Sequence, residues 1–198
     1  MRADRQFKEA AEMVQSISDI GDQIIKVAIN RLNVKLMIDT QNYSDAKRIM
    51  LKALEECPDN ISYLVDLSAI ERIVDSDSIA SETLQKAVDS VSDNTTKMEL
   101  QTLADELYRD SKYTQAAPIY EKLSEHGTSV ALLDRLLLSH YQSGQLNEAL
   151  ETAKKMDAAY GSLRRHSEIQ SVIFEYIGDL NSAKATCQRY LAKYPDDI

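Results

Sequence analysis

The feature of this sequence that most constrains its fold is an alanine that recurs at nearly constant spacing. The alanines are Ala46, Ala80, Ala116, Ala149 and Ala183, and the successive separations are 34, 36, 33 and 34 residues. Repetition with a period of this size is typical of folds built from stacked copies of one small structural unit. We therefore expect five units of about 34 residues each.

Other positions recur in register with the alanine. Twelve residues after it stands a residue type that tends to end a helix. These residues are Pro58, Ser92, Thr128, Gly161 and Pro195. Gly144 and Gly178 both stand five residues before their alanine, where a turn between two helices is expected. Each unit is thus predicted to be two antiparallel helices, with the alanine at the crossing because a larger side chain would push the helices apart.

Composition agrees with a helical chain and excludes several other classes. The 198 residues include only 5 Gly and 3 Pro, which is too few for a fold made of many strands and tight turns. Leu100, Leu103, Ala104 and Leu107 have the i, i+3, i+4, i+7 spacing of one apolar helix stripe. A single helix pair cannot bury such a stripe alone, so neighbouring units are expected to stack on it.

The stretch from Tyr43-Ser44-Asp45-Ala46 to Pro58 resembles the second half of a tetratricopeptide repeat (TPR), in which an aromatic residue, an alanine and a final proline have fixed places. The resemblance covers about residues 3–198. It implies an all-α, right-handed superhelical solenoid of antiparallel helix pairs. In that family the first helix of each pair lines the concave face.

The resemblance also predicts how the chain is divided. We expect one solenoid domain over 1–198, with repeats at 27–60, 61–96, 97–129, 130–163 and 164–198. Phe7-Lys8-Glu9-Ala10 has the pattern of Tyr43-Ser44-Asp45-Ala46, so 3–26 is predicted to be an orphan helix, the second half of another repeat. Because that half repeat lacks its first helix, we expect the chain to be a piece of a longer protein.

The sequence offers no pattern that is typical of a catalytic or metal site. It contains no glycine-rich phosphate loop and no Gly-x-Ser-x-Gly elbow. His126, His140 and His166 have no Cys or His partner three or four residues away, and Cys57 and Cys187 are 130 residues apart. We therefore expect a protein that is not an enzyme and that holds no cofactor or metal.

Charge and hydropathy restrict the partners. The net charge of −9 disfavours a phosphate-binding surface, so nucleic acid is not expected as a ligand. No stretch approaches the roughly 18 to 20 apolar residues of a membrane-spanning helix, so no membrane insertion is expected. We expect a cytoplasmic location, which an upstream export signal would change to the periplasm.

The family resemblance implies that a protein or an extended peptide binds in the concave groove, and it identifies groove positions by their distance from each alanine. Arg31, Lys35 and Arg72 are expected to form a basic end. Asp105, Asp134, Glu168 and Glu175 are expected to form an acidic end, with Tyr108 and Tyr141 between the two ends. Gln101 and Leu138 are further predicted groove positions. Opposite charges at the two ends would orient a peptide, and the tyrosines would anchor it. The alternative is that the charges are solvated and the tyrosines only cover the groove floor.

One known TPR function is not expected here. Chaperone-binding members clamp a terminal carboxylate with basic and asparagine side chains from three repeats. The corresponding positions hold Arg31 and Lys35, then Asp66, then Met98 and Thr102. Because Asp66 would repel a carboxylate, we predict that this chain does not bind that ligand.

The leading interpretation is therefore a non-catalytic scaffold that binds a protein or peptide. Three alternatives remain open. The chain could be the docking or regulatory region of a larger enzyme, a module that forms homo-oligomers through its repeat edges, or an envelope or export scaffold.

Overall fold

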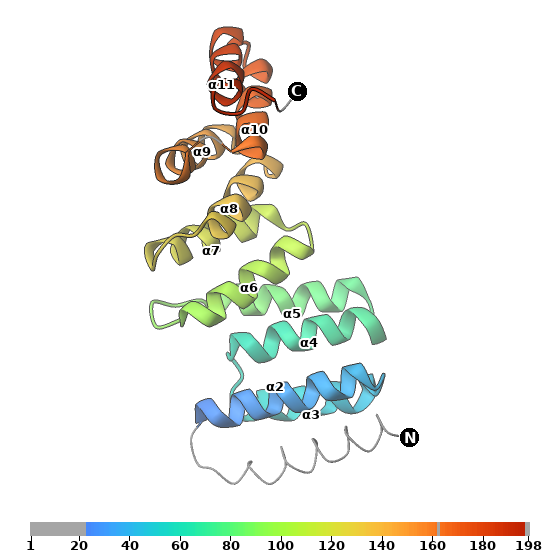
Figure 1. Cartoon of the computed structure of the whole chain (residues 1–198). Helices are drawn as coiled ribbons and strands as arrows, with labels where there is room; N and C mark the ends of the chain where they lie inside the picture. Colours follow the sequence, from blue (N-terminus) through green and yellow to red (C-terminus); the bar gives the residue numbers. More distant parts are fainter. Residues whose placement is uncertain (1–22, 162, 197–198) are drawn as a thin grey trace. The chain divides into compact units, whose positions relative to one another are not determined.

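The computed structural model describes residues 23–161 and 163–196, in which all regular secondary structure is α-helical (Figure 1). The helices are α2 (Gln23–Asp39), α3 (Tyr43–Glu56), α4 (Ile61–Val74), α5 (Asp77–Asp89), α6 (Lys97–Arg109), α7 (Tyr113–Glu125), α8 (Val130–Gln142), α9 (Leu146–Tyr160), α10 (Arg164–Tyr176) and α11 (Leu180–Lys193). The predicted orphan helix lies outside the described residues, except that its last four residues, 23–26, belong to α2. No described helix is both long enough and apolar enough to cross a membrane.

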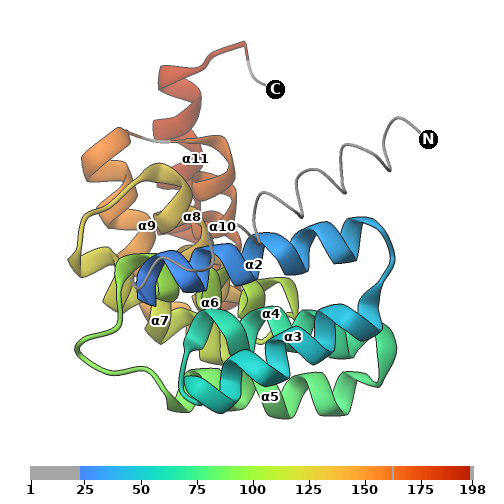
Figure 2. The ribbon, with the colours of Figure 1, turned by 90° about the horizontal axis from the view of Figure 1, so that it is seen from below.

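The helices alternate between first helices (α2, α4, α6, α8, α10) and second helices (α3, α5, α7, α9, α11). They belong to two compact units, which are described separately: an N-terminal unit that ends at Thr95 and a C-terminal unit that begins at Thr96. In the N-terminal unit α2 packs on α3, α3 on α4 and α4 on α5 (Figure 2). In the C-terminal unit each helix from α6 to α11 packs on the next.

The turn between the two helices of a pair has a recurring geometry. Gln41, Ser111, Gly144 and Gly178 each stand five residues before a repeat alanine, and all four have positive φ angles, between 58° and 81°. In each case the next residue donates its backbone N–H to a carbonyl five residues back, as Gln145 does to His140 at 2.9 Å. The two glycines were expected at this turn, and the structure shows that Gln41 and Ser111 occupy the same left-handed position.

Side-chain caps begin several first helices. Asn60 and Ser129 accept hydrogen bonds from the backbone N–H three residues later, at the starts of α4 and α8. Thr96 and Glu99 form a reciprocal capping box at the start of α6. These caps satisfy N–H groups that have no partner within the helix, and they therefore fix where the first helices begin.

The repeat alanines are buried where the paired helices pack together. Ala46, Ala80, Ala116 and Ala149 are 0% exposed and Ala183 is 4% exposed. The predicted stripe on α6, from Leu100 to Leu107, is also fully buried. The structure confirms an all-α fold of helix pairs, and the sequence pattern had located the crossing residue in each pair.

A substitution at one crossing tests this packing. We expect Ala116→Leu to lower the free energy of unfolding by about 1–3 kcal/mol, because the added carbons have no space between α6 and α7. Denaturant unfolding followed by circular dichroism measures the change. The exposed Ala158→Leu on α9 is the control, and equal stability of the two variants would show that Ala116 is not at a tight crossing.

Candidate functional site

The N-terminal unit has an open cavity between its two first helices, α2 and α4. Its volume is 370 Å³. It is lined from α2 by Arg31, Leu32, Val34, Lys35 and Ile38, and from α4 by Asp66 and Ala69. Four of the lining residues are aliphatic, and the other three are charged. Arg31 and Lys35 are residues that the sequence had placed in the groove, and the structure brings them to this cavity.

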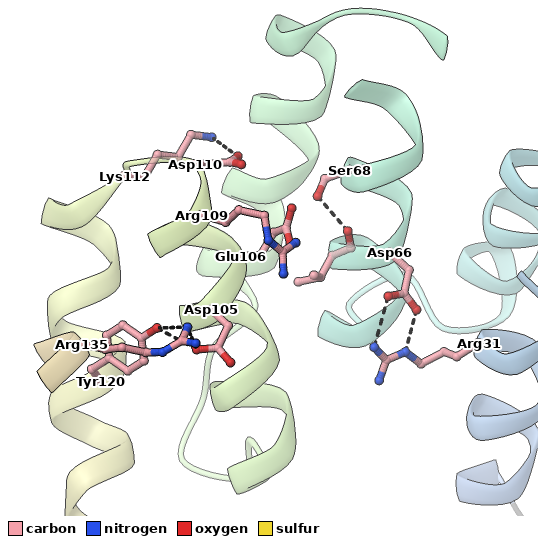
Figure 3. A network of polar contacts seen from close by, with 11 residues as sticks. Arg31, Asp66, Ser68, Asp105, Glu106, Arg109, Asp110, Lys112, Tyr120 and Arg135 are labelled. Atoms are coloured by element: carbon pink, nitrogen blue, oxygen red, sulfur yellow. Dashed lines mark hydrogen bonds and ion pairs between the residues drawn. The ribbon is translucent and has the colours of Figure 1, made fainter. Parts of the chain in front are cut away.

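Arg31 is held by a bidentate ion pair across the cavity rim. Its Nε lies 2.6 Å from Asp66 Oδ2 and its Nη2 lies 3.1 Å from Asp66 Oδ1 (Figure 3). Both side chains are about a quarter exposed, which favours a fixed geometry over a fluctuating surface pair. Lys35 is exposed and makes no ion pair with any described residue. Of the two basic residues in the cavity lining, Lys35 is therefore the one whose charge no described carboxylate neutralises.

Arg72, the third residue of the predicted basic end, does not line the cavity. It lies near the end of α4, where its Nε is 3.7 Å from Oδ1 of Asp77 at the start of α5. Asp77 is exposed, so this pair is weak. Arg72 is therefore not part of the cavity lining to which Arg31 and Lys35 belong.

In the C-terminal unit the predicted groove residue Asp105 is the centre of a polar network (Figure 3). The Tyr120 hydroxyl donates to Asp105 Oδ1 at 2.7 Å, and Arg135 Nη1 donates to the same oxygen at 2.7 Å. Gln101 Nε2 donates to the other carboxylate oxygen at 2.9 Å. The network joins α6, α7 and α8, so the Asp105 charge is used to hold three helices together.

Burial and hydrogen bonding together determine the protonation states of Tyr120 and Arg135 in this network. Burial raises the pKa of Tyr120 well above its usual value, and the hydrogen bond to Asp105 raises it further. The hydrogen bond with Tyr120 raises the pKa of Arg135. The tyrosine hydroxyl therefore stays a neutral donor and Arg135 stays charged over the physiological pH range.

The two predicted tyrosine anchors have different environments. Tyr108 is half-buried and packs edge-on against Tyr113, with ring centroids 5.4 Å apart, and against Tyr120 at 6.4 Å. The Arg135 guanidinium lies over the Tyr108 ring, 5.5 Å from its centroid. Burial raises the pKa of Tyr108. Tyr141 is also half-exposed, but it forms no ring pair with a described aromatic residue. Tyr108 is therefore a fixed part of the surface, whereas Tyr141 is less constrained.

Most of the predicted acidic end is paired within the unit. Asp134 lies 3.3 Å from Arg165 Nη1 and 3.3 Å from His166 Nε2, both on α10. Glu168 accepts a hydrogen bond from Arg164 Nε at 3.0 Å. Among the predicted acids only Glu175 is exposed without an ion pair to a described residue. Leu138, also predicted for the groove, is buried.

Three of these ion pairs share a feature that sequence reasoning missed. Arg31–Asp66, Asp105–Arg135 and Asp134–Arg165 join residues 35, 30 and 31 positions apart, which is close to one repeat. Each pair links neighbouring first helices. A search for opposite charges about one period apart would have found these partners.

The described residues contain no group of three His, Cys, Asp or Glu side chains that are arranged to hold a metal ion. Cys57 and Cys187 lie in different units and form no disulfide.

Comparison with known proteins identifies the class of fold. No protein-family model matches the sequence, and no curated protein matches it. Solved structures do match. A structure of YrrB, described as a TPR protein with an unusual peptide-binding site, has 15% identity and a TM-score of 0.62, and the match covers 96% of this chain and 93% of YrrB.

MamA structures match as well. A crystal structure of MamA has 18% identity and a TM-score of 0.59, and the match covers 87% of this chain and 96% of MamA. Residues 41 to the end of MamA from Desulfovibrio magneticus RS-1 have 12% identity and a TM-score of 0.56, with 87% and 98% covered. At these identities the likeness concerns the fold. The chain has a tetratricopeptide-type helical-repeat fold, which confirms the resemblance drawn from the alanine spacing.

A double-mutant cycle tests the network in the C-terminal unit. We expect Tyr120→Phe and Asp105→Ala to be coupled by about 1 kcal/mol in the free energy of unfolding, because each substitution removes one end of a partly buried hydrogen bond. Unfolding in denaturant of the two single variants and the double variant gives the coupling energy.

The matched control is a cycle on the exposed Glu151–Lys154 pair, for which we expect a coupling below about 0.5 kcal/mol. Additive effects of Tyr120→Phe and Asp105→Ala would contradict the proposed linkage of α6 and α7 through this hydrogen bond.

Proposed function

We propose that this chain is a non-catalytic scaffold that binds a protein, or an extended peptide segment of one, through the surfaces of its first helices. The observation that carries the proposal is the cavity between α2 and α4, whose lining includes two residues predicted for the groove. Ligand sites are concave, mostly apolar surfaces with a few fixed polar groups, and this cavity has that character.

The cavity lining indicates which peptide side chain it would accept. Leu32, Val34, Ile38 and Ala69 provide aliphatic contacts, so an aliphatic side chain of the ligand would be buried there. The volume of 370 Å³ lies within the range of small ligand sites, and it is sufficient for one or two such side chains.

Charge gives the ligand its second requirement. Lys35 is an exposed cation on the cavity rim and would attract a carboxylate that lies next to the aliphatic residue. Asp66 already holds Arg31, so a ligand carboxylate on that side would have to compete with a bidentate pair. We therefore propose an aliphatic residue with an acidic neighbour on the Lys35 side.

The C-terminal unit would supply a separate contact surface. The Tyr108 ring packs against two tyrosines and the Arg135 guanidinium. Because the ring is already held in place, little conformational entropy would be lost when a ligand binds to it. Tyr141 and Glu175 are the neighbouring groove positions whose side chains remain partly or fully exposed. Three of the four predicted acidic residues of this unit form ion pairs within it. Ligand binding by this unit would therefore depend on shape and hydrogen bonding more than on net charge.

The structural neighbours support a binding role. YrrB, which has the same fold, is described as having a peptide-binding site. The net charge of −9 supports a protein ligand over a nucleic acid.

A peptide selection tests the proposed function. We expect a library of random twelve-residue peptides, selected on the folded chain, to yield sequences with an aliphatic residue beside an acidic one. We further expect Ala69→Gln, which fills the cavity, and Lys35→Glu to weaken binding of the selected peptides about tenfold or more. Fluorescence anisotropy measures the dissociation constants.

Lys52→Glu is the matched control, because Lys52 is an exposed lysine on the second helix α3 and lies outside the cavity lining. Unchanged melting temperatures would show that the variants are folded. If the selected peptides bound Ala69→Gln and Lys35→Glu as tightly as the original chain, the cavity would not be the binding site.

A further inference from the structure

The C-terminal unit has an open cavity of 510 Å³ at the junction of α7, α8 and α9. The first helix α8, which packs on both second helices, contributes His140 to the lining. Four carboxylates line the cavity from the second helices, and Lys155 is its one basic residue. The carboxylates are Glu121 and Glu125 on α7 and Glu148 and Glu151 on α9. We call this cavity the acidic cavity.

Most of the negative charge in the acidic cavity is not neutralised. Glu151 pairs with Lys154, whose Nζ lies 2.7 Å from Glu151 Oε1. Glu125 and Glu148 are exposed and form no ion pair with a described residue. Glu121 has no Lys or Arg partner among the described residues, and its Oε1 lies 3.4 Å from His140 Nε2. The cavity therefore has an excess of negative charge that would attract a cation.

His140 adds a buried acceptor that lacks a donor. The side chain is 3% exposed, and its Nδ1 lies 3.0 Å from Gln145 Oε1. Because an amide oxygen only accepts hydrogen bonds, Nδ1 carries the hydrogen, and the neutral ring presents a lone pair at Nε2. No described residue donates a hydrogen bond to Nε2, and the group that faces it, the Glu121 carboxylate, is also an acceptor. A donor from a ligand would satisfy both groups.

The equivalent cavity one repeat later shows that the packing of repeats does not require these residues. It lies at the junction of α9, α10 and α11 and has a volume of 320 Å³. Counted from the repeat alanine, the positions of Glu121, His140, Glu148 and Glu151 are occupied there by Lys154, Phe174, Ser182 and Ala185. The carboxylates and the imidazole are therefore particular to the acidic cavity, and a role in binding accounts for them better than a role in packing.

The arrangement of the acceptors indicates the kind of cation. The described residues contain no group of His, Cys, Asp or Glu that is arranged to hold a metal ion. An arginine guanidinium is a planar fork of five N–H donors, so it can reach a carboxylate and a neighbouring acceptor at the same time. A lysine ammonium is a compact point charge with less directional preference. The pair formed by Glu121 and His140 Nε2 is suited to the guanidinium.

We propose that the acidic cavity binds an arginine side chain in an extended, basic segment of a partner protein. The guanidinium would donate hydrogen bonds to the Glu121 carboxylate and to His140 Nε2. Glu125 and Glu148 would attract a second basic residue of the same segment. The acidic cavity lies in the C-terminal unit. It is a different site from the cavity between α2 and α4, so its occupancy is tested independently of the proposed function.

The probe is the capped peptide Ac-Gly-Arg-Gly-Arg-Gly-NH2, and backbone amide chemical shifts measured by NMR give its location and its dissociation constant. Two matched peptides carry lysine or citrulline in place of both arginines. Citrulline has nearly the shape of arginine and no charge. We expect the largest shifts on α7, α8 and α9 around Glu121, His140 and Glu148. We also expect the arginine peptide to bind about threefold or more tighter than the lysine peptide and the citrulline peptide not to bind.

Variants of the chain separate this site from general attraction to an acidic protein. Glu121→Gln combined with Glu148→Gln should raise the dissociation constant of the arginine peptide about tenfold. The matched control, Glu55→Gln combined with Glu82→Gln, removes the same charge from exposed positions on α3 and α5 and should change it less than about twofold.

His140→Phe, which introduces the residue found at the equivalent position of α10, should raise the dissociation constant about threefold or more without a change in charge. Melting temperatures near that of the original chain would show that the variants are folded. Equal affinity for the arginine and lysine peptides, equal effects of the two double variants, or unchanged binding by folded His140→Phe would overturn the proposal.

Discussion

The close approach of paired helices at a buried alanine is the constraint on which the rest of the structure depends. Ala46, Ala80, Ala116 and Ala149 have no exposed surface, so the two helices of these pairs meet at methyl-sized contacts. The crossing fixes which face of each first helix packs inward and which remains available. The cavity between α2 and α4 lies on faces of these first helices that the packing leaves open.

The fold could be predicted from the sequence because its determinants are local and repeat with a fixed period. The alanine spacing gave the helix pairs, and Gly144 and Gly178 marked the turn between helices. The other occupants of that turn, Gln41 and Ser111, could not be recognised from residue type, since neither favours a positive φ. There the packing of the two helices determines the conformation of the backbone.

The candidate site was predicted less completely than the fold. The charge that a groove residue presents depends on whether an oppositely charged side chain about one repeat away in the sequence forms an ion pair with it. Counting from the alanine located Arg31 and Asp105 on first helices, but it did not identify Asp66 and Arg135 as the groups that neutralise them. The predicted acidic end is consequently mostly paired within the C-terminal unit. Lys35, which has no ion pair with a described residue, gives the cavity in the N-terminal unit its charge preference.

The central claim is that ligands contact the first helices. Backbone amide chemical-shift mapping by NMR, with a peptide selected on the folded chain, tests it most directly. We predict that the largest shifts on peptide addition fall on α2 and α4 around Lys35, Ile38 and Ala69, which line the cavity. Shifts confined to the second helices α3 and α5 would contradict the account.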